Sequence, residues 1–146
     1  MITVQYPTPD FRIKNESGRR YIFDTIRRSW LVLTEEEWVR QNFVNYLVQV
    51  LKYPSTVIAL EKEIRLHELK KRFDLLVYDK EHRPWMLVEC KEPGVALNEV
   101  VLQQALRYNI SVPVDYIVIT NGAHTIGWQK RDGRLEMLEG MPEYGG

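Results

Sequence analysis

The sequence predicts an α/β fold in which a central mixed β-sheet is flanked by helices. Segment 73–91 contains two apolar runs joined by a polar turn, a pattern typical of a β-hairpin. The apolar residues of segment 34–50 recur at helical spacing, and segment 114–120 is a continuous apolar run of the kind found in buried parallel strands. Strand and helix patterns thus alternate along the chain, which favours helices packed on a sheet.

Length and composition indicate a soluble globular protein. The 146 residues are 45% hydrophobic and 27% charged, a size and composition typical of one domain. We expect an N-terminal arm or hairpin over 1–33, a core over 34–129, and a terminal strand and tail over 130–146. The 20 basic and 20 acidic residues give a formal charge of zero. Any contact with nucleic acid must therefore use local basic patches rather than bulk charge.

Cysteine and histidine usage narrows the chemistry. One cysteine allows neither an internal disulfide nor a zinc cluster built on cysteine. The histidines at 67, 82 and 124 form no H-x-x-x-H pair, so a histidine metal site is not expected. The sequence has no signal-peptide pattern and no apolar run long enough to cross a bilayer, so we expect a cytoplasmic protein without a membrane partner.

The N-terminal segment predicts a small hairpin. Segments 11–14 and 20–23 flank the turn-like residues 15–18. This arm is locally basic, and we expect Arg27 and Arg28 to be candidates for phosphate contact, although surface arginines commonly just face solvent.

The first helix begins at Thr34, which forms a capping box with Glu37. The expected inward stripe is made of apolar residues at helical spacing: Val39, Phe43, Tyr46, Leu47 and Val50. At 100° per residue, Glu36 falls close to that stripe and Glu37 falls outside it. We therefore expect Glu36 to face the core and Glu37 to act mainly as a cap.

The following strand, expected over 57–66, carries Glu61 and Glu63. Either carboxylate could approach a site, although a solvated face is the favoured interpretation. The three basic residues before the next strand are Lys70, Lys71 and Arg72. They would hold a phosphate backbone or protect an edge strand from unwanted pairing.

Three ionisable residues interrupt the apolar runs of segment 73–91. Hairpin pairing would bring Asp74 close to Glu89, and strand alternation places Glu89 and Lys91 on one face with Cys90 on the other. Two neighbouring carboxylates repel each other unless a cation neutralises them. Mg²⁺ suits this role because it binds one or two carboxylates and keeps several waters. Lys91 would then orient the attacking water, as in metal-assisted phosphodiester hydrolysis.

The second helix is expected over 97–110. Its predicted common face consists of Leu97, Val100, Val101, Gln104, Ala105 and Tyr108. Gln104 would then be a buried amide that needs partners. A right-handed crossover would lead to the strand 114–120. A final hairpin is expected from 124–129 and 134–138, and we expect the last residues, PEYGG, to be a frayed tail.

Asp74, a gap of fourteen residues and then Glu89-Cys90-Lys91 resemble the D…ExK signature of the PD-(D/E)xK nuclease superfamily. The segments RFDLLVYD and MLVECKEP resemble the N-terminal nuclease domain of type I restriction enzyme R subunits, including short stand-alone relatives. The resemblance covers roughly 34–128. It implies a restriction-endonuclease-like fold and Mg²⁺-dependent DNA cleavage, with Mn²⁺ as a substitute.

The resemblance also implies roles for individual residues. Asp74, Glu89 and the Cys90 carbonyl would bind the metal, with Glu36 as a further acidic residue. Gln104 and Tyr108 match the Q-x-x-x-Y motif that lies near the active site in such nucleases. Expected partners are DNA and other restriction-system subunits, and a homodimer would supply two sites for two cuts. The alternative is a catalytically silent nucleic-acid-binding or assembly module that keeps the nuclease fold.

Overall fold

A computed structural model describes residues 1–66 and 68–145, so His67, one of the three scattered histidines, lies outside the described residues. The elements in chain order are β1 (Ile13–Glu16), β2 (Arg19–Asp24), β3 (Ser29–Val32), α1 (Glu35–Gln49), a short 3-10 helix η1 (Ser55–Val57), β4 (Ile58–Leu66), β5 (Leu69–Tyr78), β6 (Pro84–Cys90), α2 (Glu99–Asn109), β7 (Tyr116–Thr120), β8 (Thr125–Arg131) and β9 (Arg134–Met137). Within the described residues, no helix is long and apolar enough to span a membrane.

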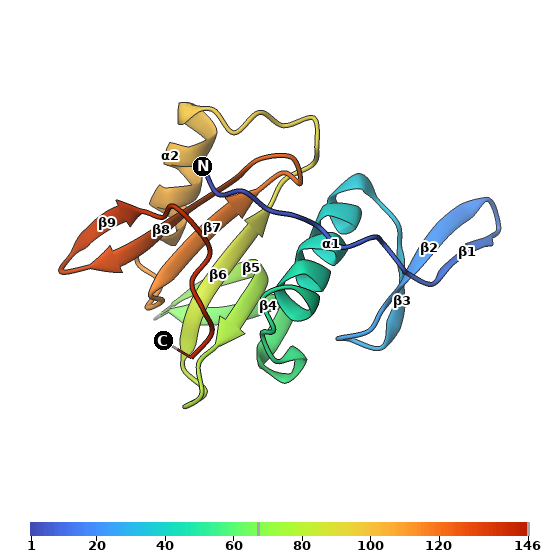
Figure 1. The fold of residues 1–146 in the computed structure, drawn as a ribbon, viewed down its shortest axis with the longest axis horizontal. Coiled ribbons are helices and arrows are strands. Elements are labelled where there is room, and N and C mark those ends of the chain that lie inside the picture. The colour runs from blue at the N-terminus through green and yellow to red at the C-terminus, as the bar shows by residue number, and fades with distance from the viewer. Residues whose placement is uncertain (67, 146) are drawn as a thin grey trace.

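The central sheet has six strands in the order β4-β5-β6-β7-β8-β9. Strands β6 and β7 run parallel, and the other neighbouring strands run antiparallel. Helix α2 connects the two parallel strands (Figure 1). The predicted α/β class, the mixed sheet and the C-terminal hairpin are confirmed.

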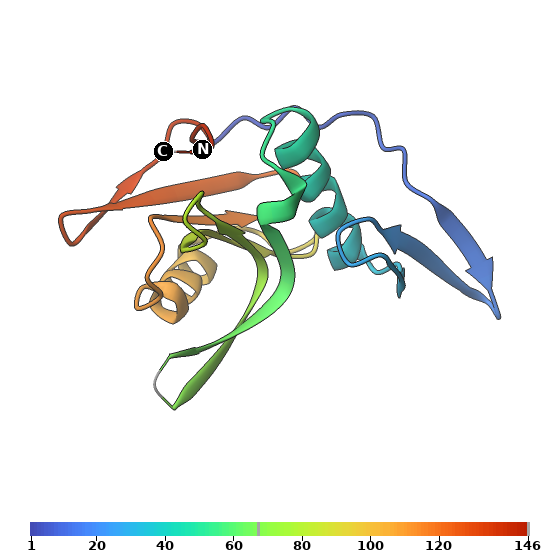
Figure 2. The same cartoon turned by 90° about the horizontal axis from the view of Figure 1, so that it is seen from below.

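The sheet is covered on both faces (Figure 2). Helix α1 and the terminal segments lie on one face, where Phe43, Leu47 and Val88 belong to one buried cluster. Helix α2 lies on the other face, where Ala105 packs in a second cluster with Leu87. The alternation of side chains along β6 supplies apolar residues to both clusters, which is why this strand is almost continuously apolar.

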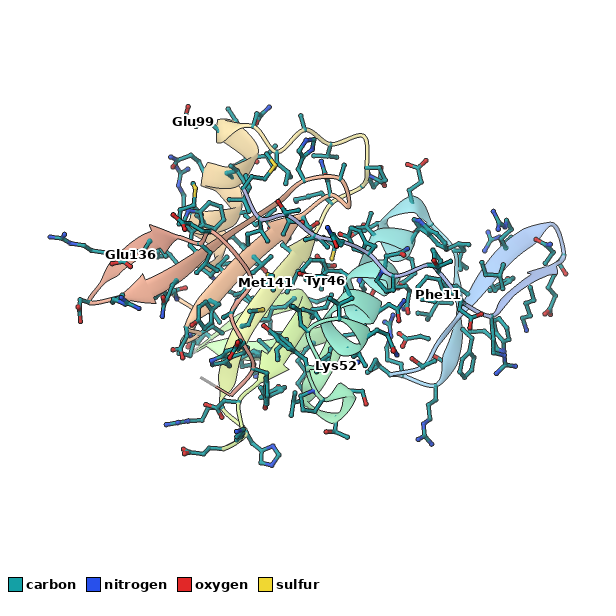
Figure 3. The ribbon with its side chains drawn as sticks, in the orientation of Figure 1. Phe11, Tyr46, Lys52, Glu99, Glu136 and Met141 are labelled. Atoms are coloured by element: carbon teal, nitrogen blue, oxygen red, sulfur yellow. The ribbon has the colours of Figure 1, made fainter. Side chains whose placement is uncertain are left out.

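A separate three-stranded antiparallel sheet, β1-β2-β3, lies on the far side of α1 from the central sheet (Figures 1 and 2). The predicted N-terminal hairpin is confirmed as β1 and β2. Strand β3 was not predicted, because it has only four residues and ends shortly before the helix cap. Figure 3 shows Phe11, just before β1, between α1 and this sheet, and its ring packs edge-on against Trp38 of α1.

Helix α1 is buried on two flanks. Its cap is confirmed, since the Thr34 hydroxyl accepts a hydrogen bond of 3.0 Å from the Glu37 backbone N–H. The predicted stripe is buried as far as Leu47, but Val50 is 45% exposed because the helix has ended there. The expectation that Glu37 acts mainly as a cap was wrong. Its side chain is buried, because Arg27 from the turn after β2 and Arg40 of α1 cover it.

The C-terminal tail was predicted to be frayed, but it is docked on the core. Tyr144 packs against Tyr53 and Trp85 with ring centroids 5.5 Å away in each case. The Tyr144 hydroxyl donates to the Tyr78 carbonyl, and the Tyr53 hydroxyl donates to the Pro142 carbonyl. The aromatic ring of the tail therefore completes the core on the α1 side of the sheet.

Candidate active site

The β5–β6 hairpin brings Asp74 and Glu89 close to each other. The ladder ends with the pair Leu75 and Val88, and Asp74 and Glu89 come directly beyond it on the two strands, where they line one small cavity. Here the Asp74 carboxylate accepts a hydrogen bond of 2.8 Å from the Cys90 backbone N–H. The register thus brings together the two acidic residues that the hairpin pattern predicted.

Lys91 lies beside Glu89 on the face of the sheet that carries α2. The Lys91 Nζ is 3.7 Å from Glu89 Oε1. Cys90 points to the opposite face and is buried in the core beneath α1. This is the alternation that the sequence predicted.

The Glu89 carboxylate is poorly satisfied for a buried group. Its Oε2 atom is buried and has no hydrogen-bond partner among the residues that the structure describes. Burial raises the pKa of Glu89, the Lys91 ammonium opposes that rise, and the Asp74 carboxylate adds to it. A buried acceptor without a partner costs free energy, so this oxygen is available to a ligand.

Arg40 of α1 is a central member of the site that sequence reasoning missed. It is buried, and its Nη2 donates to Asp74 Oδ1 at 2.8 Å. Its Nη1 donates to Glu37 Oε1 at 2.6 Å and lies 3.2 Å from Glu61 Oε1. Burial alone would lower the pKa of Arg40, but the bonded Asp74 and Glu37 carboxylates outweigh it and raise the pKa. The available signal was the spacing of Arg40 from Glu36 and Glu37, which places all three on neighbouring turns of one helix.

The adjacent residues Glu36 and Glu37 have different environments. Glu37 Oε2 accepts from the Gln41 amide at 3.0 Å, and Glu37 Oε1 is bound by Arg40. Glu36 has a side chain that is 41% exposed, 3.4 Å from Arg40. Partial burial and the Asp74 carboxylate raise the pKa of Glu36, so this acid lies within the electrostatic field of the site. Its role as a metal ligand stays a prediction.

Glu61 also joins the site, which corrects the expectation that its side chain belongs to a solvated face. Its backbone φ is 49° within strand β4, and the β4–β5 pairing skips the position that faces Asp74. A positive φ is unfavourable for a residue with a Cβ, so its position is held by contacts. One such contact is the bond of 2.6 Å from Arg72 to Glu61 Oε2. Glu63, in contrast, is exposed as expected.

The predicted inner face of α2 is confirmed for Leu97 and Ala105 but was wrong for Val100, Gln104 and Tyr108. Ala105 and Asn109 are buried, whereas Val100, Gln104 and Tyr108 are exposed. Apolar residues occupy more than half of the circumference of this helix, so spacing alone does not identify one stripe. Gln104 is therefore not the buried amide that the pattern suggested.

Gln104 and Tyr108 nevertheless reach the candidate site. They line a pocket of about 240 Å³ together with Glu89 and Lys91. Val95, in the segment before α2, lines the same pocket. The Q-x-x-x-Y pair thus faces the carboxylate and the ammonium across an open space, although the structure does not test its catalytic role.

The residues predicted to contact nucleic acid have varied environments. Lys71 donates to the Tyr108 carbonyl and lies 4.7 Å from the centre of the Tyr108 ring. Arg72 binds Glu61, and Arg27 binds Asp24 at 2.5 Å, so both are engaged within the protein. The remaining two, Lys70 and Arg28, are exposed. Contacts from these five residues to nucleic acid stay predictions.

The donor set fits Mg²⁺ better than a metal that needs a full protein cage. Among residues 1–66 and 68–145, no three His, Cys, Asp or Glu side chains form a ready-made metal site. Asp74 and Glu89 offer two carboxylates, and Mg²⁺ characteristically takes one or two and keeps its waters. The buried Glu89 Oε2 is an acceptor that such an ion would satisfy. The predicted role of the Cys90 carbonyl as a ligand is not tested by these contacts.

The mixed sheet, with Asp74, Glu89 and Lys91 on its central hairpin, defines a nuclease-like α/β domain. The chain belongs to the family of the type I restriction enzyme R protein N terminus, whose family model matches residues 35–142. This range includes α1 and the whole central sheet, and β1 to β3 precede it. A search of curated proteins found no significant match.

Proposed function

We propose that this chain is a metal-dependent deoxyribonuclease of a type I restriction system, with Asp74, Glu89 and Lys91 as its catalytic centre. The observation that carries the proposal is the Glu89 carboxylate, which has one buried oxygen without a partner and lies 3.7 Å from the Lys91 ammonium. A carboxylate that has an unpartnered oxygen and lies close to a second carboxylate is typical of a functional site. Membership of the R protein family supports the same activity.

Mg²⁺ or Mn²⁺ would be held by Asp74 and Glu89, with Glu36 and the Cys90 carbonyl as further ligands. When bound, such an ion activates water and neutralises charge on a phosphoryl oxygen. Arg40 supports this arrangement because its bond to Asp74 fixes one carboxylate before the ion arrives. Asp74 would therefore offer an oriented carboxylate, and Glu89 would offer an oxygen that has no partner within the protein.

Lys91 would orient the attacking water and stabilise the negative charge that develops on the phosphate. Its side chain is 35% exposed and opens into the pocket lined by Gln104 and Tyr108. Preorganised donors aimed at developing charge contribute strongly to catalysis. Gln104 and Tyr108 would hold the substrate backbone on the other side of that pocket.

The proposed substrate is DNA, with Lys70 and Arg72 near the start of β5 as candidate phosphate contacts. Lys70 is exposed, and Arg72 would exchange part of its ion pair with Glu61 for a phosphate. Other restriction-system subunits are the proposed protein partners, as the family suggests. A homodimer would bring two such centres to the two strands of a duplex.

Cleavage of supercoiled plasmid by the purified protein tests the proposal. With Mg²⁺ or Mn²⁺ the protein should nick and linearise the plasmid, and EDTA should stop the reaction. Lys91→Ala should reduce the rate by about 10²-fold or more. Lys80→Ala, an exposed lysine on the β5–β6 turn, is the matched control and should cut like the unmodified protein. Equal cutting by the Lys91 variant, or none by folded protein, would contradict the proposal.

A second candidate function is a silent nucleic-acid-binding or assembly module. One observation favours it: both Asp74 oxygens already accept hydrogen bonds within the protein, from Arg40 and from the Cys90 N–H. In that case the folded protein should bind its partner in EDTA, show no cleavage with either ion, and keep the same affinity after Lys91→Ala. Metal-dependent cutting that requires Lys91 would exclude this function.

A further inference from the structure

The outward face of the β1–β3 sheet combines aromatic rings with basic side chains. Strand alternation and the register place six of them on one face: Arg12, Lys14, Arg19, Tyr21, Phe23 and Trp30. We call this set the aromatic-basic face. The opposite face is the inner one, since Ile22 is completely buried. The aromatic-basic face is thus the side turned away from α1.

The rings and cations of this face are in direct contact. Phe23 and Trp30 are register partners, and their ring centroids are 5.3 Å apart. The Arg12 guanidinium lies 4.8 Å from the Phe23 centroid, and the Lys14 ammonium lies 4.5 Å from the Trp30 centroid. Flexible cations therefore cover rings that are themselves only partly buried.

Positive charge is concentrated in this sheet. Segment 11–32 contains six arginine or lysine residues and two acidic residues, whereas the whole chain is neutral. Of the two acids, Asp24 is fully buried and bonded to Arg27, so it adds little to the outer surface. Glu16 is the register partner of Arg19 on the same face and lies 3.1 Å from Lys14, so one acid stands against the three cations Arg12, Lys14 and Arg19. Arg12 and Arg19 are exposed, which leaves the face with an excess of positive charge.

We propose that the aromatic-basic face binds single-stranded nucleic acid. Unpaired bases present flat faces that stack on aromatic side chains, and cations beside those rings neutralise the phosphates. In a duplex the base faces are stacked on one another and cannot reach such a platform. Arg12 and Lys14 would move from the rings to the backbone when bases stack, which the length of their side chains allows.

This surface is distinct from the candidate active site. It lies on the far side of α1 from the central sheet (Figures 1 and 2), and β1 to β3 precede the range matched by the family model. The proposal therefore does not depend on cleavage activity. A strand held here would be an additional anchor for a nucleic acid whose other part reaches the central sheet.

The proposal is tested by fluorescence anisotropy of the full chain in EDTA, which prevents cleavage during the titration. The probes are labelled single-stranded DNA of about 20 nucleotides, the same sequence as RNA, and the DNA duplex. Charge reversal at two exposed positions, Arg12→Glu with Arg19→Glu, is compared with Arg131→Glu and Arg134→Glu on the distant β8–β9 turn. Thermal unfolding verifies that each variant is folded.

We expect both single strands to bind more tightly than the duplex. The Arg12 and Arg19 variant should lose about tenfold or more in affinity. The slope of its log affinity plotted against log salt concentration should become shallower by about 0.7 for each lost phosphate contact. Trp30→Leu should lower affinity at least about fivefold while leaving the salt slope unchanged. Duplex binding as tight as single-strand binding, an equal loss in the β8–β9 variant, or no binding by the folded chain would overturn the proposal.

Discussion

The two carboxylates of the central hairpin lie close together but have different surroundings. Asp74 has a partner for each oxygen, the Arg40 guanidinium at 2.8 Å and the Cys90 N–H at 2.8 Å. Glu89 has one weak ion pair at 3.7 Å and one buried oxygen without a partner among the described residues. Asp74 therefore contributes to holding the fold together, whereas Glu89 is kept at a cost to stability.

This difference separates a structural role from a functional one within a single pair of residues. The Asp74 side belongs to a network that reaches from α1 through Arg40 to β4 through Glu61. The Glu89 side opens into the pocket with Lys91, Gln104 and Tyr108. A ligand that bridges the two sides would find one acid oriented and the other unsatisfied.

Replacing Arg40 should break the Asp74 side most severely. Arg40→Met leaves Asp74 and Glu37 without their main cation in a buried setting, and we expect a loss of about 3–5 kcal/mol in the free energy of unfolding. Chemical denaturation measures the change. Arg134→Met, at an exposed position on β9, should change stability by less than about 0.5 kcal/mol. Similar losses in both variants would show that the network around Arg40 is not what stabilises this region.

Neutralising each facing carboxylate should change stability in opposite directions. Asp74→Asn removes charge-assisted hydrogen bonds to Arg40 and should cost about 1.5–3 kcal/mol. Glu89→Gln removes a buried charge and should stabilise the protein by about 0.5–2 kcal/mol at neutral pH. The test compares the denaturant midpoints of the two variants, provided that the free energy of unfolding depends equally steeply on denaturant concentration in both. Destabilisation by Glu89→Gln would contradict the view that Glu89 is unsatisfied in the absence of a ligand.

The neighbours Glu36 and Glu37 give a finer test of the same contrast. Glu37→Gln should cost about 1–2 kcal/mol because Arg40 loses a buried partner at 2.6 Å. Glu36→Gln should change stability by less than about 0.5 kcal/mol, since its side chain is 41% exposed. Thermal unfolding of the two variants side by side measures both effects. A larger loss for Glu36 would reverse the assignment of the two acids.

The pH dependence of the free energy of unfolding should report the contribution of Glu89 alone. The folded-state pKa of Glu89 is raised by burial, so the folded protein holds this proton more tightly than the unfolded chain does. The stabilisation that comes from this tighter proton binding is fully present below the ordinary carboxyl pKa. It is lost as the pH rises through the raised folded-state pKa of Glu89. The advantage of Glu89→Gln over the unmodified protein should therefore grow with pH across that window. A difference that stays constant with pH would contradict the raised pKa.

The parts of the site that follow from strand geometry could be predicted from sequence. Apolar runs and a polar turn define the hairpin, and the two-residue period then fixes the relation of Glu89, Cys90 and Lys91. The closeness of Asp74 to Glu89 follows from the pairing of the two strands up to Leu75 and Val88. Local rules suffice here because the residues belong to one supersecondary unit.

The parts that depend on packing between distant elements could not be predicted. Arg40 bonds to Asp74, which lies 34 positions later in the sequence. Glu61 contacts Arg40 from a strand position with a positive φ. Burial of α1 on both flanks conceals the periodicity that would have marked Glu37 as buried. The orientation of α2 failed for the opposite reason, since its apolar residues allow more than one inner face.

The most direct test of the account is Mn²⁺ binding measured by electron paramagnetic resonance, without nucleic acid. We predict that the unmodified protein binds Mn²⁺ and that Glu89→Gln weakens this binding by about tenfold or more. Glu63→Gln, an exposed acid on β4, should bind the ion like the unmodified protein. Unchanged affinity in the Glu89 variant would contradict the claim that its unsatisfied carboxylate is held for a metal ion.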